Sequence, residues 1–212
     1  MTVAISDQDG IRRITLDRPR KRNALNSATM AAICDALEAA AADAEIRAVV
    51  LAGNGVVFSA GGDLAEMAEP ATEAQKATRT ALMLRLFDLP ATLPLPVIAA
   101  VHGSAVGAGA ALALACDMMV MAADATLVWP EAKHRIAPTQ VAPPLIARVP
   151  RAVAFDLLAT SRPMLPEEAR HLGLAARVVP PEALAAEAHR LAVESTLMPS
   201  EMLLALKRMI AP

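Results

Sequence analysis

The amino-acid sequence predicts an α/β fold, and three observations support this prediction. Short segments of continuous apolar character, such as 47–51 and 97–101, have the pattern of strands in a sheet that is covered on both faces. Longer segments with helix caps stand between these strands, as in proteins that alternate strands with helices. The chain has 212 residues, enough for one domain with a substantial core.

Turn residues and helix caps set the order of the expected elements. Asp9-Gly10 is the turn dipeptide of a hairpin, and Asn26 or Ser27 can cap the first helix. The expected strands are 3–6, 11–16, 47–51, 97–101, 118–122, 126–129 and 178–179. The expected helices cover about 27–43, 72–88 and 107–116, and further helices begin near residues 143, 151, 166, 181 and 201. We expect the prolines at 90, 94 and 96 to end the second helix, and a turn over 102–106 to precede the third.

Composition excludes several classes of protein. The formal charge is −2, no basic stripe dominates, and the chain has three Phe, one Trp and no Tyr, so we expect no nucleic-acid partner. Cys34 and Cys116 lie far apart in apolar stretches, which favours buried free thiols in a reducing compartment. The four histidines lack ligand spacing, so no metal site is expected.

Two further observations concern localisation. Residues 97–128 are strongly apolar, but His102-Gly103-Ser104 and Asp117 interrupt them, which favours a strand, a turn and a buried helix over a membrane span. The first residues do not have the pattern of a signal peptide. The sequence therefore predicts a cytoplasmic protein without a membrane segment.

Two glycine-bearing turns stand between a buried strand and a helix, at 58–64 and at 103–109. The first N–H groups of a helix have no partner within it, and small side chains let a ligand approach them. Two such turns that face each other can aim two N–H groups at one developing oxyanion. For either turn alone, tight turning and close helix–sheet packing are the favoured explanation; the two turns together with a carboxylate on a third segment favour a site.

Glu131 is the candidate acid or base. It follows an apolar strand at Pro130, so we expect it at a strand end beside apolar walls. Burial there raises a carboxyl pKa toward the range that is useful for moving protons. The alternative is a surface glutamate that caps a loop.

These segments carry a resemblance to a known family. The chain resembles the enoyl-CoA hydratase/isomerase (crotonase) family in the order and spacing of Leu16-Asp17-Arg18-Pro19, Asn23-Ala24-Leu25-Asn26, 58–64, 96–103, Ala115-Cys116-Asp117, Pro130-Glu131 and Gly173-Leu174. The resemblance implies a ClpP-like spiral of ββα units with flanking helices. It also implies one domain over 1–212, with the spiral core at 1–180 and C-terminal helices at 181–212, and assembly into a homotrimer or hexamer.

The resemblance also implies the site. The N–H groups of Gly62 and Ala108 would hold the thioester oxygen of an acyl-CoA substrate, and Glu131 would be the acid or base. Ala108 stands where the family usually has glycine, which costs about 1 kcal/mol if the site requires a positive φ. Coenzyme A enters as part of the substrate, with no separate cofactor. The positions implied to hold it are Lys21, Arg22, Ala24, Ala60, Asp63 and Leu64. The basic early loop suits a phosphorylated carrier.

The sequence departs from the family pattern at Ala111, where hydratases commonly have a second glutamate. A single carboxylate resembles the family's isomerases, which move a double bond from C3 to C2. Residues 136–143, however, resemble a hydratase branch that acts on methylglutaconyl-type or isohexenylglutaconyl-type thioesters and also lacks this glutamate. Hydration of a 2-enoyl-CoA is favoured, with isomerisation as the alternative. Arg135 or His134 is a candidate for binding a distal carboxylate, or belongs to a solvent-facing basic turn.

Other classes fit less well. A dinucleotide fingerprint at Gly107 needs Gly or Ala at position 112, which is Leu, and a serine-hydrolase motif would need Ser104 one place later. A non-catalytic acyl-CoA-binding paralogue is the main alternative to an enzyme. The chain stops at Pro212, where family members usually continue into a segment that covers the acyl site. We therefore expect a missing tail, or a neighbouring subunit that closes the pocket.

Overall fold

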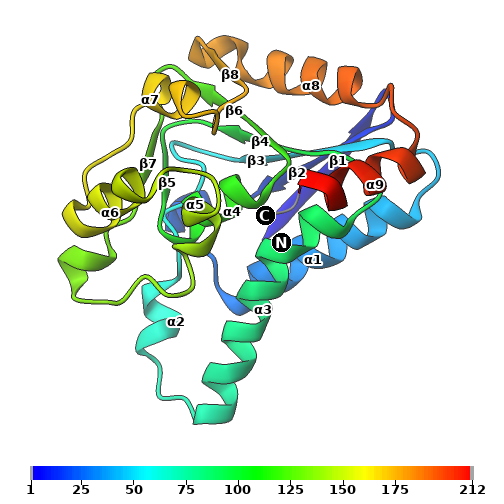
Figure 1. The fold of residues 1–212 in the computed structure, drawn as a ribbon. Coiled ribbons are helices and arrows are strands. Elements are labelled where there is room, and N and C mark those ends of the chain that lie inside the picture. Colours follow the sequence, from blue (N-terminus) through cyan, green and yellow to red (C-terminus); the bar gives the residue numbers. More distant parts are fainter. Residues whose placement is uncertain (1, 211–212) are drawn as a thin grey trace.

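The computed structural model describes residues 2–210 and contains two sheets (Figure 1). The larger sheet has the order β1-β2-β3-β4-β6-β8, and the smaller one pairs β5 with β7. Only β1 runs antiparallel to its neighbour; the other pairs are parallel. The strands are β1 Val3–Gln8, β2 Ile11–Leu16, β3 Ala48–Gly53, β4 Val97–Val101, β5 Ser104–Val106, β6 Met118–Ala122, β7 Thr126–Val128 and β8 Arg177–Val179.

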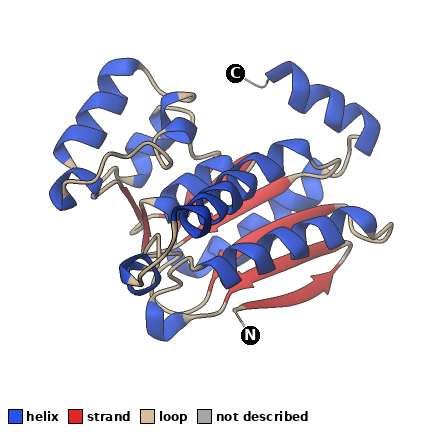
Figure 2. Ribbon diagram, turned by 90° about the horizontal axis from the view of Figure 1, so that it is seen from below, coloured by secondary structure: helices blue, strands red, loops and turns tan. Residues whose placement is uncertain are grey.

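Helices cover both faces of the larger sheet. The α-helices are α1 Ser27–Ala42, α2 Leu64–Ala68, α3 Glu73–Thr92, α4 Ala108–Ala115, α5 Pro143–Ile146, α6 Arg151–Thr160, α7 Pro166–His171, α8 Leu184–Ser195 and α9 Ser200–Ile210. Short 3₁₀ helices are Pro19–Lys21, Glu131–His134 and Pro181–Ala183. Helix α8 packs across β3, β4 and β6 on one face, and α1 and α4 pack on the other (Figures 1 and 2). No helix within residues 2–210 is long and apolar enough to cross a membrane.

The predicted sheet is confirmed in its main features. All of β4 and the first five residues of β3 are buried, as parallel strands covered on both faces require. The hairpin turn at Asp9 and Gly10 has φ values of 54° and 76°, which suits a tight two-residue turn. Asn26 caps α1 by accepting a hydrogen bond from the Thr29 N–H.

Two predictions about elements are wrong. Residues 104–106 are strand β5 and not part of a turn, because they pair in parallel with β7 more than twenty residues later in the chain. Pro90 does not end α3, which continues to Thr92. Pro90 lies inside the helix and cannot donate to the Leu86 carbonyl, and the helix ends only two residues later.

A buried lysine attaches α9 to the rest of the fold. Lys207 is 5% exposed, and its Nζ lies 2.7 Å from Asp117 Oδ2. The same ammonium donates to the carbonyl oxygens of Pro90 and Leu95, at 2.7 and 2.8 Å. Asp117 in turn accepts the N–H of Val97, the first residue of β4. The end of α3, the start of β4 and α9 are therefore joined at one point.

Candidate active site

Backbone pairing brings the two glycine-bearing turns together. Ser59 forms a parallel bridge with Ala105, and the N–H of Val106 donates to the carbonyl of Ser59 at 2.9 Å. The N–H of Gly107 donates to the carbonyl of Val128 at 2.7 Å, and β7 pairs with β5 on the side opposite Ser59. The turn after β3, the turn after β4 and the segment after β7 are therefore neighbours, as the resemblance implied.

Two glycines permit this close approach. Gly61 has a φ of +89°, and a Cβ there would lie 2.5 Å from the carbonyl oxygen of Val106. Gly107 has a φ of +50°, and a Cβ there would lie 2.6 Å from Glu131 Oε1. At Gly61 a Cβ would collide with backbone, which cannot move aside, whereas at Gly107 it would strain the backbone and displace the Glu131 side chain. The second contact also shows that the Glu131 carboxylate lies directly against the backbone at Gly107.

The two expected N–H donors are available to a ligand. Gly62 and Ala108 both line the main cavity, and their N–H groups have no hydrogen-bond partner among residues 2–210. Ala108 is the first residue of α4, where an N–H has no acceptor within the helix. The positive φ is at Gly107 and not at Ala108, so alanine at 108 carries no backbone strain.

Glu131 begins the 3₁₀ helix that follows β7, directly after Pro130. Its side chain is half-buried, and Oε2 is buried without a hydrogen-bond partner among the described residues. Burial raises the pKa of the Glu131 carboxyl, against smaller opposing effects of a backbone hydrogen bond and of His134. A carboxyl group with a raised pKa is better suited to accept and return a proton than an exposed one.

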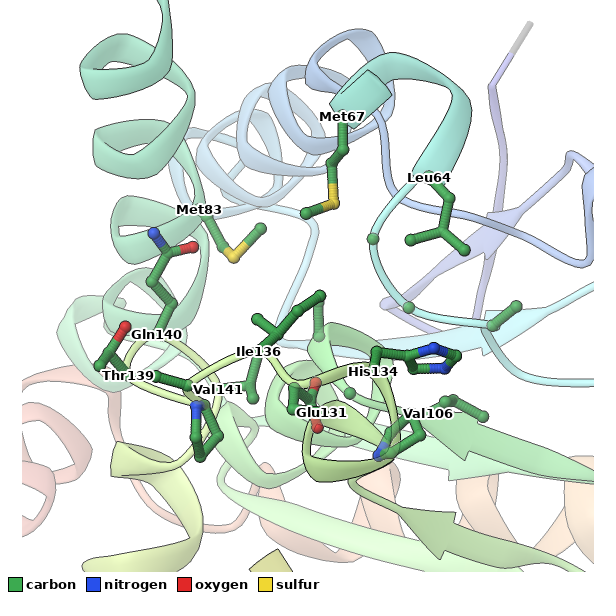
Figure 3. Close-up of a pocket in the computed structure, with 18 residues that line it drawn as sticks. Leu64, Met67, Met83, Val106, Glu131, His134, Ile136, Thr139, Gln140 and Val141 are labelled. Atoms are coloured by element: carbon green, nitrogen blue, oxygen red, sulfur yellow. The ribbon is translucent and has the colours of Figure 1, made fainter. Parts of the chain in front are cut away.

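These groups share one cavity of about 400 Å³, which we call the main cavity (Figure 3). Its walls are mostly apolar and come from the two turns, from α2 and α3, and from the segment after Glu131. The lining residues are Ala60, Gly61, Gly62, Leu64, Met67, Met83, Val106, Gly107, Ala108, Pro130, Glu131, His134 and 136–141. Among these described residues Glu131 is the only carboxylate. Ala111 is fully buried in α4 and does not line the cavity.

Backbone hydrogen bonds join the early basic loop, which contains Lys21 and Arg22, to the first glycine-bearing turn at 58–64. The Ala60 N–H donates to the Arg22 carbonyl at 2.8 Å, and the Leu25 N–H donates to the Gly61 carbonyl at 2.8 Å. Ala60 and Leu64 line the main cavity, whereas Lys21, Arg22 and Ala24 lie outside its lining. The loop is thus beside the cavity without forming its wall.

The carboxylate of Asp63 already has partners within the fold. It accepts the N–H groups of Ala65 and Glu66 at the start of α2, and it pairs with Arg18 at 2.9 Å. Burial alone would raise the pKa of Asp63, but the hydrogen bond from Arg18 and those from the helix outweigh it and lower the pKa. Its predicted contact with coenzyme A therefore concerns its backbone and not its carboxylate.

The structure adds residues that the sequence did not single out. The sequence analysis placed Gly61 and Gly107 in the two turns. Their contacts with Val106 and Glu131 join residues far apart in the chain, so no local sequence pattern predicts them. Met67 and Met83, from α2 and α3, point into the main cavity (Figure 3). Of the two candidates for binding a distal carboxylate, His134 lines the cavity. Arg135 does not, and takes a left-handed conformation with a φ of 56°.

Two unpaired N–H groups beside one carboxylate of raised pKa are suited to an acid–base catalyst that acts next to a carbonyl group. The comparisons with known proteins agree with this class. The family model described as enoyl-CoA hydratase/isomerase matches residues 6–211, and the chain belongs to this family.

Relatives and solved structures support the assignment. The chain is 41% identical over 206 residues to a putative enoyl-CoA hydratase of Thermus thermophilus, covering 92% of this chain and 81% of that one. It is 38% identical over 181 residues to the 2,3-dehydroadipyl-CoA hydratase of Escherichia coli, covering 83% and 68%. The fold matches an enoyl-CoA hydratase structure from Mycobacterium smegmatis with a TM-score of 0.92 and 32% identity, covering 98% of this chain and 81% of that one.

Proposed function

We propose that the protein hydrates a 2-enoyl-CoA, with the thioester oxygen held by the N–H groups of Gly62 and Ala108 and with Glu131 as acid and base. The observation that carries this proposal is the position of the Glu131 carboxylate against Gly107, one residue before a free N–H group. The names of several relatives, which are hydratases, support the direction of the reaction.

In the proposed reaction, the two N–H groups stabilise the negative charge that develops on the thioester oxygen as an enolate forms. Loss of one such donor costs about 3 kcal/mol of transition-state stabilisation. The Glu131 carboxylate accepts a proton from a water molecule whose oxygen bonds to C3 of the acyl chain. Glu131 then gives that proton to C2, which completes the addition of water and returns the carboxylate to its starting state.

The alternative reaction is isomerisation of a 3-enoyl-CoA to a 2-enoyl-CoA. It has support in Ala111, because a buried alanine outside the cavity leaves Glu131 as the single carboxylate among the described lining residues. One base can remove a proton from C2 and return it to C4, which needs no second group to hold water. The methylglutaconyl-type branch is a further proposal, which rests on the sequence of residues 136–143.

For coenzyme A itself, we propose contacts along the early basic loop and the first turn. The proposed positions are Lys21, Arg22, Ala24, Ala60, Asp63 and Leu64. The backbone hydrogen bonds that join these two segments support the proposal, since they hold the loop against the first turn, which lines the main cavity. Cationic side chains there suit the phosphate groups of the carrier.

The test follows the absorbance of the conjugated thioester. Purified protein is mixed with 2-enoyl-CoAs, including 3-methylglutaconyl-CoA, and separately with a 3-enoyl-CoA. Falling absorbance with a 2-enoyl substrate indicates hydration, and rising absorbance with the 3-enoyl substrate indicates isomerisation. The Glu131→Gln variant should lose either signal. Binding of CoA esters without turnover of any of them would contradict the proposal and identify a non-catalytic member of the family.

A further inference from the structure

A second cavity adjoins the main one. It has a volume of about 250 Å³, and we call it the side cavity. Gly62, Met67, Met83 and Gln140 line both cavities, so the two spaces meet at these side chains. Gly62 offers one of the proposed oxyanion donors, and the side cavity therefore begins beside the place where the thioester would be held. Methionine side chains are flexible and let a chain pass between them.

The side cavity is lined by cationic and polar side chains from α3. Arg79, Lys76 and Thr80 come from this helix, which extends with α2 away from the sheet (Figure 1). Lys76 is exposed and pairs with Glu73 at 2.8 Å. Arg79 differs from it: the residue is partly buried, and within residues 2–210 no carboxylate lies within 4 Å of its guanidinium. Its one hydrogen bond runs from Nη1 to the carbonyl oxygen of Glu66, at 3.2 Å.

The other polar groups of the side cavity leave room for an anion at Arg79. The Glu66 carboxylate also lines the cavity, but both of its oxygens accept the N–H of Ser27, at 3.0 and 3.1 Å. The Thr80 hydroxyl oxygen accepts a hydrogen bond from Gln140 Nε2 at 3.1 Å, so its own proton can be donated to a ligand. The other carboxylate of the lining, Asp63, accepts the N–H groups of Ala65 and Glu66 and pairs with Arg18. Arg79 and Thr80 therefore offer donors, and both carboxylates of the side cavity have partners.

We propose that Arg79 binds a carboxylate at the far end of the acyl chain, so that the substrates are CoA thioesters of dicarboxylic acids. This inference rests on the proposed function for the placement of the thioester. A guanidinium matches a carboxylate with two parallel hydrogen bonds, and partial burial strengthens the pairing. The acyl chain passes from the oxyanion donors between Met67 and Met83 into the side cavity. Arg79 thereby determines specificity without touching the reacting atoms.

The test measures binding of saturated thioesters, which have no double bond to react. Matched pairs of equal chain length are compared by calorimetry: glutaryl- with pentanoyl-CoA, adipyl- with hexanoyl-CoA, and pimelyl- with heptanoyl-CoA. For at least one pair, the wild-type protein should bind the ω-carboxylate form about tenfold more tightly, as one charge-assisted contact allows. Arg79→Met should remove this preference, and Arg79→Lys should keep part of it. Arg85→Met is the matched control, because Arg85 lies on the same helix and pairs with Glu38 outside both cavities.

Three results would overturn the inference. One is equal affinity within every pair for the wild-type protein. Another is equal weakening of both members of a pair by Arg79→Met, which would mean that Arg79 binds a phosphate of coenzyme A or supports the fold. The third is the same loss of preference in Arg85→Met. Turnover separates this inference from the proposed function: a protein that prefers the ω-carboxylate thioester but hydrates or isomerises none retains the inference and loses the proposed reaction.

Discussion

At the scale of single residues, Gly107 lies directly against the proposed catalytic carboxylate. Its φ is +50°, and a Cβ would meet the Glu131 carboxylate at 2.6 Å. We predict that Gly107→Ala lowers kcat by about 100-fold, because a displacement of the catalytic group of about 1 Å has effects of this size. Steady-state turnover of the identified enoyl-CoA substrate checks this.

Gly173→Ala is the matched control for that change. Gly173 also has a positive φ, of +75°, but nothing lies within 4 Å of the Cβ that alanine would add. Both variants should therefore lose about 1 kcal/mol of stability from backbone strain, and only Gly107→Ala should lose activity. Equal activity in the two variants would mean that the contact with Glu131 has no catalytic importance.

The buried carboxyl of Glu131 leads to a prediction about pH. Burial raises its pKa, so the proton-accepting form is lost on acidification at a pH above the usual value for glutamate, which is about 4.3. Hydration should therefore decline as the pH falls through this raised pKa, as a profile of kcat/KM against pH would show. An acidic limb at or below the ordinary glutamate value would contradict the assignment.

The raised pKa of Glu131 also affects stability, and here acidification is favourable. A carboxyl pKa that is higher in the folded protein favours folding at low pH, and this contribution is lost as the pH rises through the folded value. Glu131→Gln removes the buried charge, so its Tm at neutral pH should equal or exceed that of the wild-type protein. At acidic pH, where Glu131 is protonated in the folded protein, the difference in Tm between the variant and the wild-type protein should become smaller.

The sequence alone predicted the candidate catalytic residues but not their surroundings. Local patterns, namely glycines before helices and a carboxylate after a proline, indicated the two turns and Glu131, whereas Gly62 and Ala108 were assigned from the family resemblance. The contacts of Gly61 with Val106 and of Gly107 with Glu131 join residues far apart in the chain. No local pattern encodes such a contact, and the same holds for the position of Arg79 in the side cavity.

At the scale of elements, α9 depends on Lys207. Its ammonium is buried with Asp117, and burial lowers the pKa of Lys207 and raises that of Asp117. Lys207→Met leaves the Asp117 carboxylate without this partner, so we predict a loss of about 3 kcal/mol in the free energy of unfolding. Urea denaturation followed by circular dichroism measures it.

Two further variants test the cause. Arg208→Met changes the neighbouring, exposed cation and should leave stability within about 0.5 kcal/mol of the wild-type value. The double variant Lys207→Met with Asp117→Asn should recover part of the lost stability, since it removes the unpaired charge. A double variant as unstable as the sum of the two single variants would show that charge pairing is not the reason.

Helices and strands were predictable where the residues that determine them are neighbours in the sequence. The hairpin of β1 and β2 and the N-terminal cap of α1 follow from neighbouring residues, and the structure agrees with them. Strand β5 was missed because three residues of mixed burial become a strand only through pairing with β7. The end of α3 was misplaced because a proline removes one helical hydrogen bond but does not by itself stop the helix, which continues two residues beyond Pro90.

At the scale of the whole molecule, we propose one domain over residues 1–212, made of the core at 1–180 and the helices at 181–212. Within the described residues, α8 packs across β2, β3, β4 and β6 of the large sheet, and Lys207 attaches α9 to the start of β4. These contacts support joint unfolding of both parts.

Apolar side chains on α9 lead to a prediction about assembly. Met202, Met209 and Ile210 are 59%, 81% and 71% exposed in the single chain. Together with the family resemblance, this exposure leads us to expect a homotrimer or hexamer in which α9 is covered by another copy. Light scattering should give a mass of three or six chains, and Met202→Lys with Met209→Lys should lower it. Glu201→Lys, on the polar side of the same helix, should leave the mass unchanged. A wild-type protein that is monomeric at micromolar concentration would contradict the expectation.

The backbone pairing that unites the two turns with β7 has a consequence for how this molecule can change over evolutionary time. The groups proposed to do chemistry are spaced by main-chain hydrogen bonds among 59–62, 104–108 and 126–131, whereas Met67, Arg79 and Met83 belong to the α2–α3 arm. Substitutions in the arm can alter which acyl chains fit while the spacing of donors and base is inherited unchanged. Substrate preference can therefore change during evolution while the catalytic groups keep their arrangement.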